Sequence, residues 1–300
     1  QGKYDEAEPL FREALEVLRE TLGNRHPRTL SSINTLGMLL QNKGDLAAAL
    51  ALLHEALEGQ RETLGNQHPD TLFSVSSLGQ LLKAKGELVA AGLLLREALE
   101  TQRETLGNRH PDTLTSVDSL GMLLESKGGE GDFAAAELLL YEALETRRET
   151  LGNRHSRTLS SICNLGLLLE SKGGEGDLAA AELLLHEALE GRRETLGNRH
   201  QETLFTICNL GRLLGSKGNL AAAELLLREA VEVQRETLGD RHQETLFSIE
   251  SLGRLLKSKG DLAAAVPLLR EALGDRHPIT LLSVMRLNVM LEANCDLGAA

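Results

Sequence analysis

The stretch HPDTLFSVSSLGQLLKAKGELVAAGLLLREALETQRETLGNR, residues 68–109, decides the architecture of the chain. Its apolar residues recur every three or four positions in two segments, 69–85 and 87–106, which predicts two amphipathic helices. Pro69 suits the first position of a helix, and Gly86 suits the left-handed cap that ends one. The stretch therefore forms one helical hairpin, with a first and a second helix.

The rest of the chain repeats this hairpin with small changes. The dipeptide Leu-Gly marks one point of the first helix and returns at spacings of 42, 42, 45, 45 and 42 residues. It occurs at Leu36-Gly37, Leu78-Gly79, Leu120-Gly121, Leu165-Gly166, Leu210-Gly211 and Leu252-Gly253. A fixed period in this range indicates a solenoid, in which each repeat packs only on its neighbours. The sequence thus predicts an all-α, right-handed α-solenoid of helical hairpins with a 42–45-residue period.

The bounds of the helices follow from this register. We expect first helices at about 27–43, 69–85, 111–127, 156–172, 201–217, 243–259 and 278–294. We expect second helices at about 45–64, 87–106, 132–151, 177–196, 219–238 and 261–273. Together they make one solenoid over residues 1–300, with a partial first unit at 1–24, six full units at 25–274 and a degenerate, truncated last unit at 275–300. Because residues 1–22 match a second helix without its partner, we expect the chain to be a fragment of a longer array.

Two residue types return in every hairpin. The glycine of the Leu-Gly step lies in mid-helix, where it costs about 1 kcal/mol relative to alanine. Its return predicts a point where the second helix comes too close for a side chain. Histidine stands before each first helix, at positions 26, 68, 110, 155, 200, 242 and 277. Since side chains one repeat apart cannot converge on one metal, we expect these histidines to cap the turns.

Other changes lie at the ends and outer faces of the second helices. Units three and four carry the sequence KGGEGD at 127–132 and 172–177, three residues longer than elsewhere, which predicts a longer surface turn or a contact edge for a partner. Pairs such as Glu100 and Arg103, at i,i+3 spacing, are expected to solvate the outer face. The residues expected to cap the second helices are Asp45, Asp132, Asp177, Asn219 and Asp261.

The composition narrows the function. A net charge of −12 and an aromatic content of 2% argue against a nucleic-acid partner, which needs a basic face or stacking platforms. No apolar run reaches about 18 residues, so we expect no membrane insertion. No catalytic motif, metal site or cofactor site is recognisable. Three cysteines without framework spacing suggest a cytoplasmic protein. Cys163 and Cys208 share one position in adjacent units and are expected to be small buried or groove residues.

A second stripe of the first helices differs at every repeat and is expected to line the concave groove. Drift of solvent-exposed residues would explain the variation, and so would a groove that meets an extended, non-repeating peptide. The middle of the stripe is acidic, and its later part is basic beside two phenylalanines. These residues are Asp118, Glu125 and Glu170, then Phe205, Arg212, Phe247, Arg254 and Lys257. We therefore expect an acidic peptide with an apolar anchor to dock over units five and six.

The phrase RETLGNRHPDTL at 103–114, with its 42-residue period, resembles the tetratricopeptide repeats of kinesin light chains. Similar units occur in nephrocystin-type proteins and behind some signalling NTPase domains. In kinesin light chains the concave groove holds short cargo-adaptor peptides, often acidic with an aromatic anchor. The resemblance implies a non-catalytic scaffold that binds partner proteins. The variable stripe of the first helices and the resemblance to kinesin light chains together give the residues of the candidate peptide-binding groove: Asn34, Phe73, Lys83, Phe205, Arg212, Phe247, Arg254 and Lys257.

The same resemblance leaves some questions open. The heptad segment that joins light chains to the motor's heavy chain is not found in these residues, which puts motor association in doubt. One alternative is a structural array that self-associates end to end, which a concentration-independent monomer in solution would argue against. Another is a sensor arm attached to the effector domain of a larger signalling protein.

Overall fold

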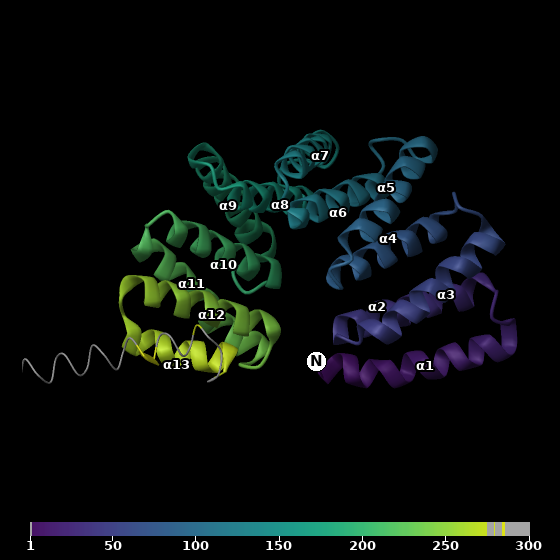
Figure 1. Cartoon of the computed structure of the whole chain (residues 1–300), viewed down its shortest axis with the longest axis horizontal. Helices are drawn as coiled ribbons and strands as arrows, with labels where there is room; N and C mark the ends of the chain where they lie inside the picture. Colours follow the sequence, from purple (N-terminus) through teal and green to yellow (C-terminus); the bar gives the residue numbers. More distant parts are fainter. Residues whose placement is uncertain (1, 275–278, 280–283, 286–300) are drawn as a thin grey trace, which may run out of the picture. The chain divides into compact units, whose positions relative to one another are not determined.

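A computed structural model describes residues 2–274, 279, 284 and 285, and the regular structure of these residues is entirely α-helical. The contacts between Cα atoms fall into two clusters, so the chain has two compact units, residues 1–146 (unit 1) and 147–300 (unit 2). Within each unit the helices pack successively as hairpins (Figure 1). The predicted all-α repeat solenoid is therefore confirmed. A single solenoid over residues 1–300 stays a prediction, and the predicted last unit, with His277 and the helix at 278–294, lies outside the described residues apart from three positions.

The helices begin and end close to the predicted residues. Unit 1 contains α1 (Gly2–Leu22), α2 (Pro27–Lys43), α3 (Leu46–Leu64), α4 (Pro69–Ala84), α5 (Leu88–Thr105), α6 (Pro111–Lys127) and most of α7 (Glu130–Leu151). Unit 2 contains the end of α7, then α8 (Ser156–Lys172), α9 (Glu175–Leu196), α10 (Gln201–Ser216), α11 (Leu220–Leu238), α12 (Gln243–Lys259) and α13 (Leu262–Leu273). First helices have even numbers and second helices odd numbers.

In each hairpin the two helices approach each other closely at the glycine of the Leu-Gly step. A Cβ atom built on Gly79 would lie 2.9 Å from Cγ and Cδ2 of Leu95, a buried leucine of the facing second helix. The same clash, at 2.8–3.1 Å, would occur between Gly37 and Leu53, Gly121 and Leu140, Gly166 and Leu185, Gly211 and Leu227, and Gly253 and Leu269. The predicted close approach is confirmed, and it explains why glycine stands in mid-helix.

The recurrent histidines cap the first helices, as predicted. In each of the six described hairpin junctions, the histidine Nδ1 accepts a hydrogen bond of 3.1–3.3 Å from the backbone N–H two residues later. An accepted bond of this kind satisfies one of the free N–H groups at a helix start. At the other end of the helix, Gly44, Gly128, Gly173 and Gly260 take the left-handed conformation expected of a C-cap.

In the two repeats with KGGEGD at 127–132 and 172–177, the three added residues lengthen the second helix. The predicted longer turn is therefore wrong. Helices α7 and α9 begin at Glu130 and Glu175, inside the added segment, because a glutamate in the first turn is stabilised by the helix dipole. Asp132 and Asp177 therefore lie inside the first turn and pair with Lys127 and Lys172 at 2.8 and 3.1 Å instead of capping the helix. Two of the other predicted caps, Asp45 and Asp261, accept a side-chain hydrogen bond from a backbone N–H in the first turn of the helix. The side chain of Asn219 makes no such hydrogen bond.

The outer faces of the second helices carry ion pairs between hairpins. Arg103 pairs with Glu142 of the next second helix at 2.6 Å, which corrects the expected pairing with Glu100 in its own helix. Equivalent pairs at 2.5–2.9 Å join Arg19 to Glu55, Arg61 to Glu97, Arg148 to Glu187, Arg193 to Glu229 and Arg235 to Glu271. Each contributes only about 0–1 kcal/mol because it is partly exposed.

None of the described helices combines the length and the apolar character that crossing a bilayer requires.

Replacing glycine by alanine should have opposite effects at two helical positions of unit 1. Gly79→Ala should lower the free energy of unfolding by about 1 kcal/mol, because overpacking against Leu95 outweighs the gain in helix propensity. Gly131→Ala should raise it by up to about 1 kcal/mol, because Gly131 lies in α7 with open space around the new Cβ. Urea unfolding followed by circular dichroism checks both variants, and a change of the same sign in the two would contradict the close-contact explanation.

The cap at α8 can be tested by replacing and restoring the acceptor. His155→Ala should cost about 1 kcal/mol of unfolding free energy, because the backbone N–H of Arg157 loses its partner. His155→Asn should recover most of that loss, since asparagine is a strong N-cap residue. Thermal unfolding of the three proteins gives the comparison. Equal destabilisation by alanine and asparagine would show that the imidazole acts through some other contact.

Candidate functional site

The eight candidate groove residues divide between the two units. Asn34, Phe73 and Lys83 lie in unit 1, on α2 and α4. The other five lie on α10 and α12 of unit 2. The two groups are therefore described separately.

In unit 1 the stripe is only partly open to solvent. Asn34 is buried, and its Oδ1 accepts a 3.1 Å hydrogen bond from the Ser74 hydroxyl of α4. The expectation that Asn34 faces a groove is wrong for this structure, because its position lies between two neighbouring first helices. The same helix position holds Cys163 and Cys208 in unit 2; both thiols are free and buried, and burial raises the pKa of each.

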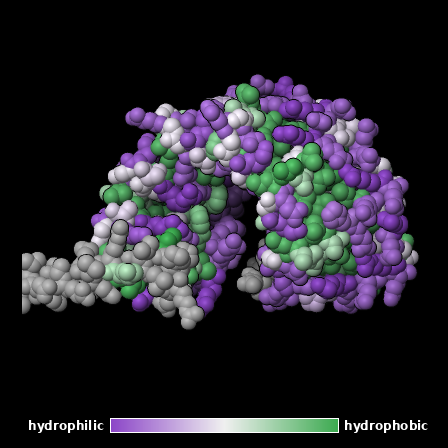
Figure 2. All heavy atoms as spheres, viewed as in Figure 1, coloured by the Kyte–Doolittle hydropathy of each residue, from purple (hydrophilic) through white to green (hydrophobic). Residues whose placement is uncertain are grey.

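Phe73 and Lys83 sit on the accessible side of α4. Phe73 is 55% exposed, and Figure 2 shows hydrophobic side chains gathered over α2 and α4. Lys83 Nζ donates a 3.0 Å hydrogen bond to the backbone oxygen of Met122 on α6, and partial burial lowers the pKa of its ammonium group. This lysine therefore links two first helices and is less free than an exposed side chain to meet a ligand.

Unit 2 brings three of its five candidates together around an open cavity of about 580 Å³ between α10 and α12. Arg212 and Phe247 line it from neighbouring helices, with the Arg212 guanidinium carbon 5.6 Å from the centre of the Phe247 ring. Arg254 lines the same cavity about two turns after Phe247 on α12. Buried Leu227 and Leu255 contribute apolar surface to the lining. The cavity thus offers an apolar surface beside two arginines.

The charge of this cavity is more balanced than the sequence stripe implied. Arg212 pairs with Glu170 of α8 at 3.3 Å and also donates a 3.0 Å hydrogen bond to Asn209. Arg254 donates a 2.7 Å hydrogen bond to Glu250 on its own helix. The two arginines and two glutamates formally cancel, so the cavity itself is not a net basic patch. Lys257 lies one turn beyond Arg254, outside the lining of this cavity.

A second cavity of about 370 Å³ shares Phe247 with the first. Its lining comes from α10, α11 and the start of α12: Phe205, Cys208, Gln234, Gln243, Glu244, Phe247 and Ser248. Phe205 and Phe247 are 42% and 41% exposed, whereas Gln234 is 1% exposed. We call this space the Gln234 cavity. It contains both predicted phenylalanines and a buried amide that the sequence analysis did not single out.

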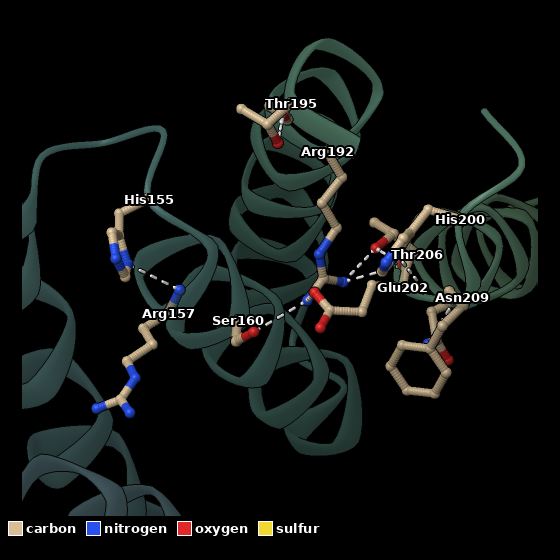
Figure 3. A network of polar contacts seen from close by, with 11 residues as sticks. His155, Arg157, Ser160, Arg192, Thr195, His200, Glu202, Thr206 and Asn209 are labelled. Atoms are coloured by element: carbon tan, nitrogen blue, oxygen red, sulfur yellow. Dashed lines mark hydrogen bonds and ion pairs between the residues drawn. The ribbon is translucent and has the colours of Figure 1, made fainter. Parts of the chain in front are cut away.

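One hairpin earlier, a buried arginine occupies the position of Gln234. The Arg192 side chain of α9 is 4% exposed and reaches the neighbouring first helices on both sides (Figure 3). Its Nη1 donates to the Thr206 hydroxyl at 2.5 Å and to the Glu202 carbonyl at 3.2 Å, and its Nη2 lies 3.3 Å from the Glu202 carboxylate. Nη2 also donates to the Ser160 hydroxyl at 3.2 Å. Aligning the hairpins would have revealed this position, which is glutamine at 60, 102 and 234 but arginine at 147 and 192.

Comparisons with known protein families identify the same helical repeat. Two models described as tetratricopeptide repeat match residues 29–70, 74–112 and 113–157, and residues 1–41 and 173–236. No curated protein sequence matches the chain.

Solved structures give the same result. A Podosopora anserina protein described as a kinesin light chain, with nearly identical TPR-like repeats, is 27% identical with a TM-score of 0.57, covering 71% of this chain and 98% of that one. BtubC (BKLC) from P. vanneervenii is 25% identical with a TM-score of 0.62, covering 79% and 92%. The apo form of RapI, at 14% identity and a TM-score of 0.56, covers 89% and 98% and shares the fold alone.

Proposed function

Because the chain belongs to the tetratricopeptide repeat family in its kinesin light chain-like form, we propose that it is a non-catalytic scaffold that binds short acidic peptides of partner proteins. Repeats of this family are protein-interaction scaffolds. The peptide would lie over α10 and α12 and place an apolar anchor in the cavity beside Phe247. The observation that carries the proposal is the meeting of Arg212, Arg254 and Phe247 around one open space.

The existing ion pairs of these arginines are compatible with such a ligand. The side chains of Arg212 and Arg254 are 39% and 53% exposed, so their pairs with Glu170 and Glu250 are worth only about 0–1 kcal/mol each. A carboxylate of the ligand can replace either glutamate at small cost. Binding of this kind depends on exposed charges, and it should be fast to form and sensitive to salt.

A protein contact through the second helices, different from end-to-end stacking, has one observation in its favour. The second helices expose a leucine at the same position of four successive hairpins, with 66–74% of each residue accessible: Leu93, Leu138, Leu183 and Leu225. Exposed apolar residues in a regular series are suited to contact another protein surface. They lie on the second helices, so an interface there would leave the cavities on the first helices free.

The acidic-peptide proposal can be tested without knowing the natural partner. A random peptide library selected on the immobilised chain should yield sequences enriched in Asp and Glu around one large apolar residue. The affinity of a selected peptide should fall about tenfold or more in Arg212→Glu/Arg254→Glu, and also at high salt. A control, Arg96→Glu/Arg157→Glu, makes the same change in net charge at exposed residues outside both cavities.

Fluorescence anisotropy of the labelled peptide gives the three affinities. Selected sequences without acidic enrichment, or equal losses in the groove variant and the control, would contradict the proposed site.

A further inference from the structure

The Gln234 cavity contains buried hydrogen-bonding atoms that are not paired. Gln234 Oε1 and Glu244 Oε2 are both buried and have no hydrogen-bond partner among the described residues. The other carboxylate oxygen of Glu244 accepts a bond from Gln201. The Ser248 hydroxyl is also fully buried, beside the Cys208 thiol. Leaving such groups unpaired is costly, so the cavity lacks a donor that would satisfy them.

The preceding hairpin shows which donor fits this arrangement. Gln234, Glu244 and Ser248 lie 42 residues after Arg192, Glu202 and Thr206 and occupy the same places in the repeat. In that hairpin the Arg192 guanidinium donates to the Thr206 hydroxyl and the Glu202 backbone carbonyl, and it forms an ion pair of 3.3 Å with the Glu202 carboxylate (Figure 3). The next hairpin thus carries the same kinds of acceptor but has a shorter side chain, Gln234, in the place of the arginine.

A guanidinium group has the chemistry that these acceptors require. It carries five N–H donors in a plane and no acceptor, whereas Gln234 Oε1 and Glu244 Oε2 can only accept. The Glu244 carboxylate compensates the positive charge, which would otherwise be expensive to bury. At the mouth of the cavity, Phe205 stands where Ser160 stands one hairpin earlier, and Phe247 faces it across the lining. Aromatic faces attract a guanidinium ion, so the mouth also suits an arginine side chain.

We propose that the Gln234 cavity binds an arginine side chain of a partner peptide, in the place that Arg192 fills within the chain itself. That the arginine belongs to a peptide rests on the proposed scaffold function. That a guanidinium group fits the cavity does not depend on that function. The peptide would then be acidic toward Arg212 and Arg254 and would carry one arginine on the other side of Phe247. A lysine would fit less well, because its compact ammonium group lacks the planar fork by which Arg192 reaches the two first helices beside it.

The direct test uses a single amino-acid probe, N-acetyl-arginine methylamide, titrated into the whole chain and followed by NMR. Saturable shifts in the ring resonances of Phe205 and Phe247 are expected with this probe, and much smaller ones with the lysine and citrulline analogues. Gln234→Arg should abolish the shifts, because the chain then supplies its own guanidinium. Glu244→Gln should weaken binding about tenfold or more through loss of a charge-assisted hydrogen bond.

The preceding hairpin provides the reciprocal variant. Arg192→Gln should open an equivalent space and add a second arginine site, doubling the number of probe molecules bound. Its fold can be checked by circular dichroism, and glutamine at this position is already accepted in three hairpins. Absence of saturable shifts in the wild type, equal binding of citrulline, or unchanged binding in Gln234→Arg would each overturn the inference.

Failure of this inference and failure of the proposed function give different results. Selected acidic peptides whose affinity is unchanged when arginine is replaced by citrulline, with no binding of the probe, would overturn the arginine site and leave the acidic groove. Specific binding of the probe in a chain that selects no acidic peptide would support the arginine site and contradict the acidic groove.

Discussion

The close contact between a glycine of each first helix and a leucine of its partner is the constraint on which the hairpins depend. At Gly79 and its five equivalents, even a methyl group would meet the leucine side chain at about 3 Å. Because the helices approach so closely here, the Ala and Leu positions around the contact are buried and nearly constant from one hairpin to the next. Variation is then confined to residues that leave this packing unchanged, and those residues distinguish one hairpin from another.

The position of Arg192 and Gln234 shows how much one such change can do. In both hairpins the first helix that follows begins with a histidine cap and carries a glutamate in its first turn. Replacing the arginine by glutamine leaves a cavity lined by unpaired acceptors between two exposed phenylalanines. Neighbouring hairpins of the same backbone pattern can thus carry either a polar site filled by their own arginine or an open cavity at the same position. The wider cavity beside Arg212 and Arg254 adjoins it and shares Phe247.

Much of this structure follows from local sequence signals, and the exceptions have specific causes. Helix bounds were predictable because caps such as His155 and Gly173 act on the residues beside them. The added residues before Asp132 were misjudged as a turn, since glycines suggested a loop while Glu130 could start a helix. The burial of Asn34 could not be read from helical spacing, which does not show whether a residue faces solvent or the neighbouring first helix. Pairs such as Arg103 and Glu142 depend on the offset between hairpins, which appears only when the hairpins are packed.

A crystal structure of the Gln234→Arg variant would test most directly whether the cavity is a vacant guanidinium site. The account predicts that the new guanidinium lies within hydrogen-bond distance of the Ser248 hydroxyl and the Glu244 carboxylate, as Arg192 does with Thr206 and Glu202. The two phenylalanine rings should keep their positions at the mouth. A new arginine directed into solvent, with the acceptors of Gln234's neighbours still unpaired, would contradict the account.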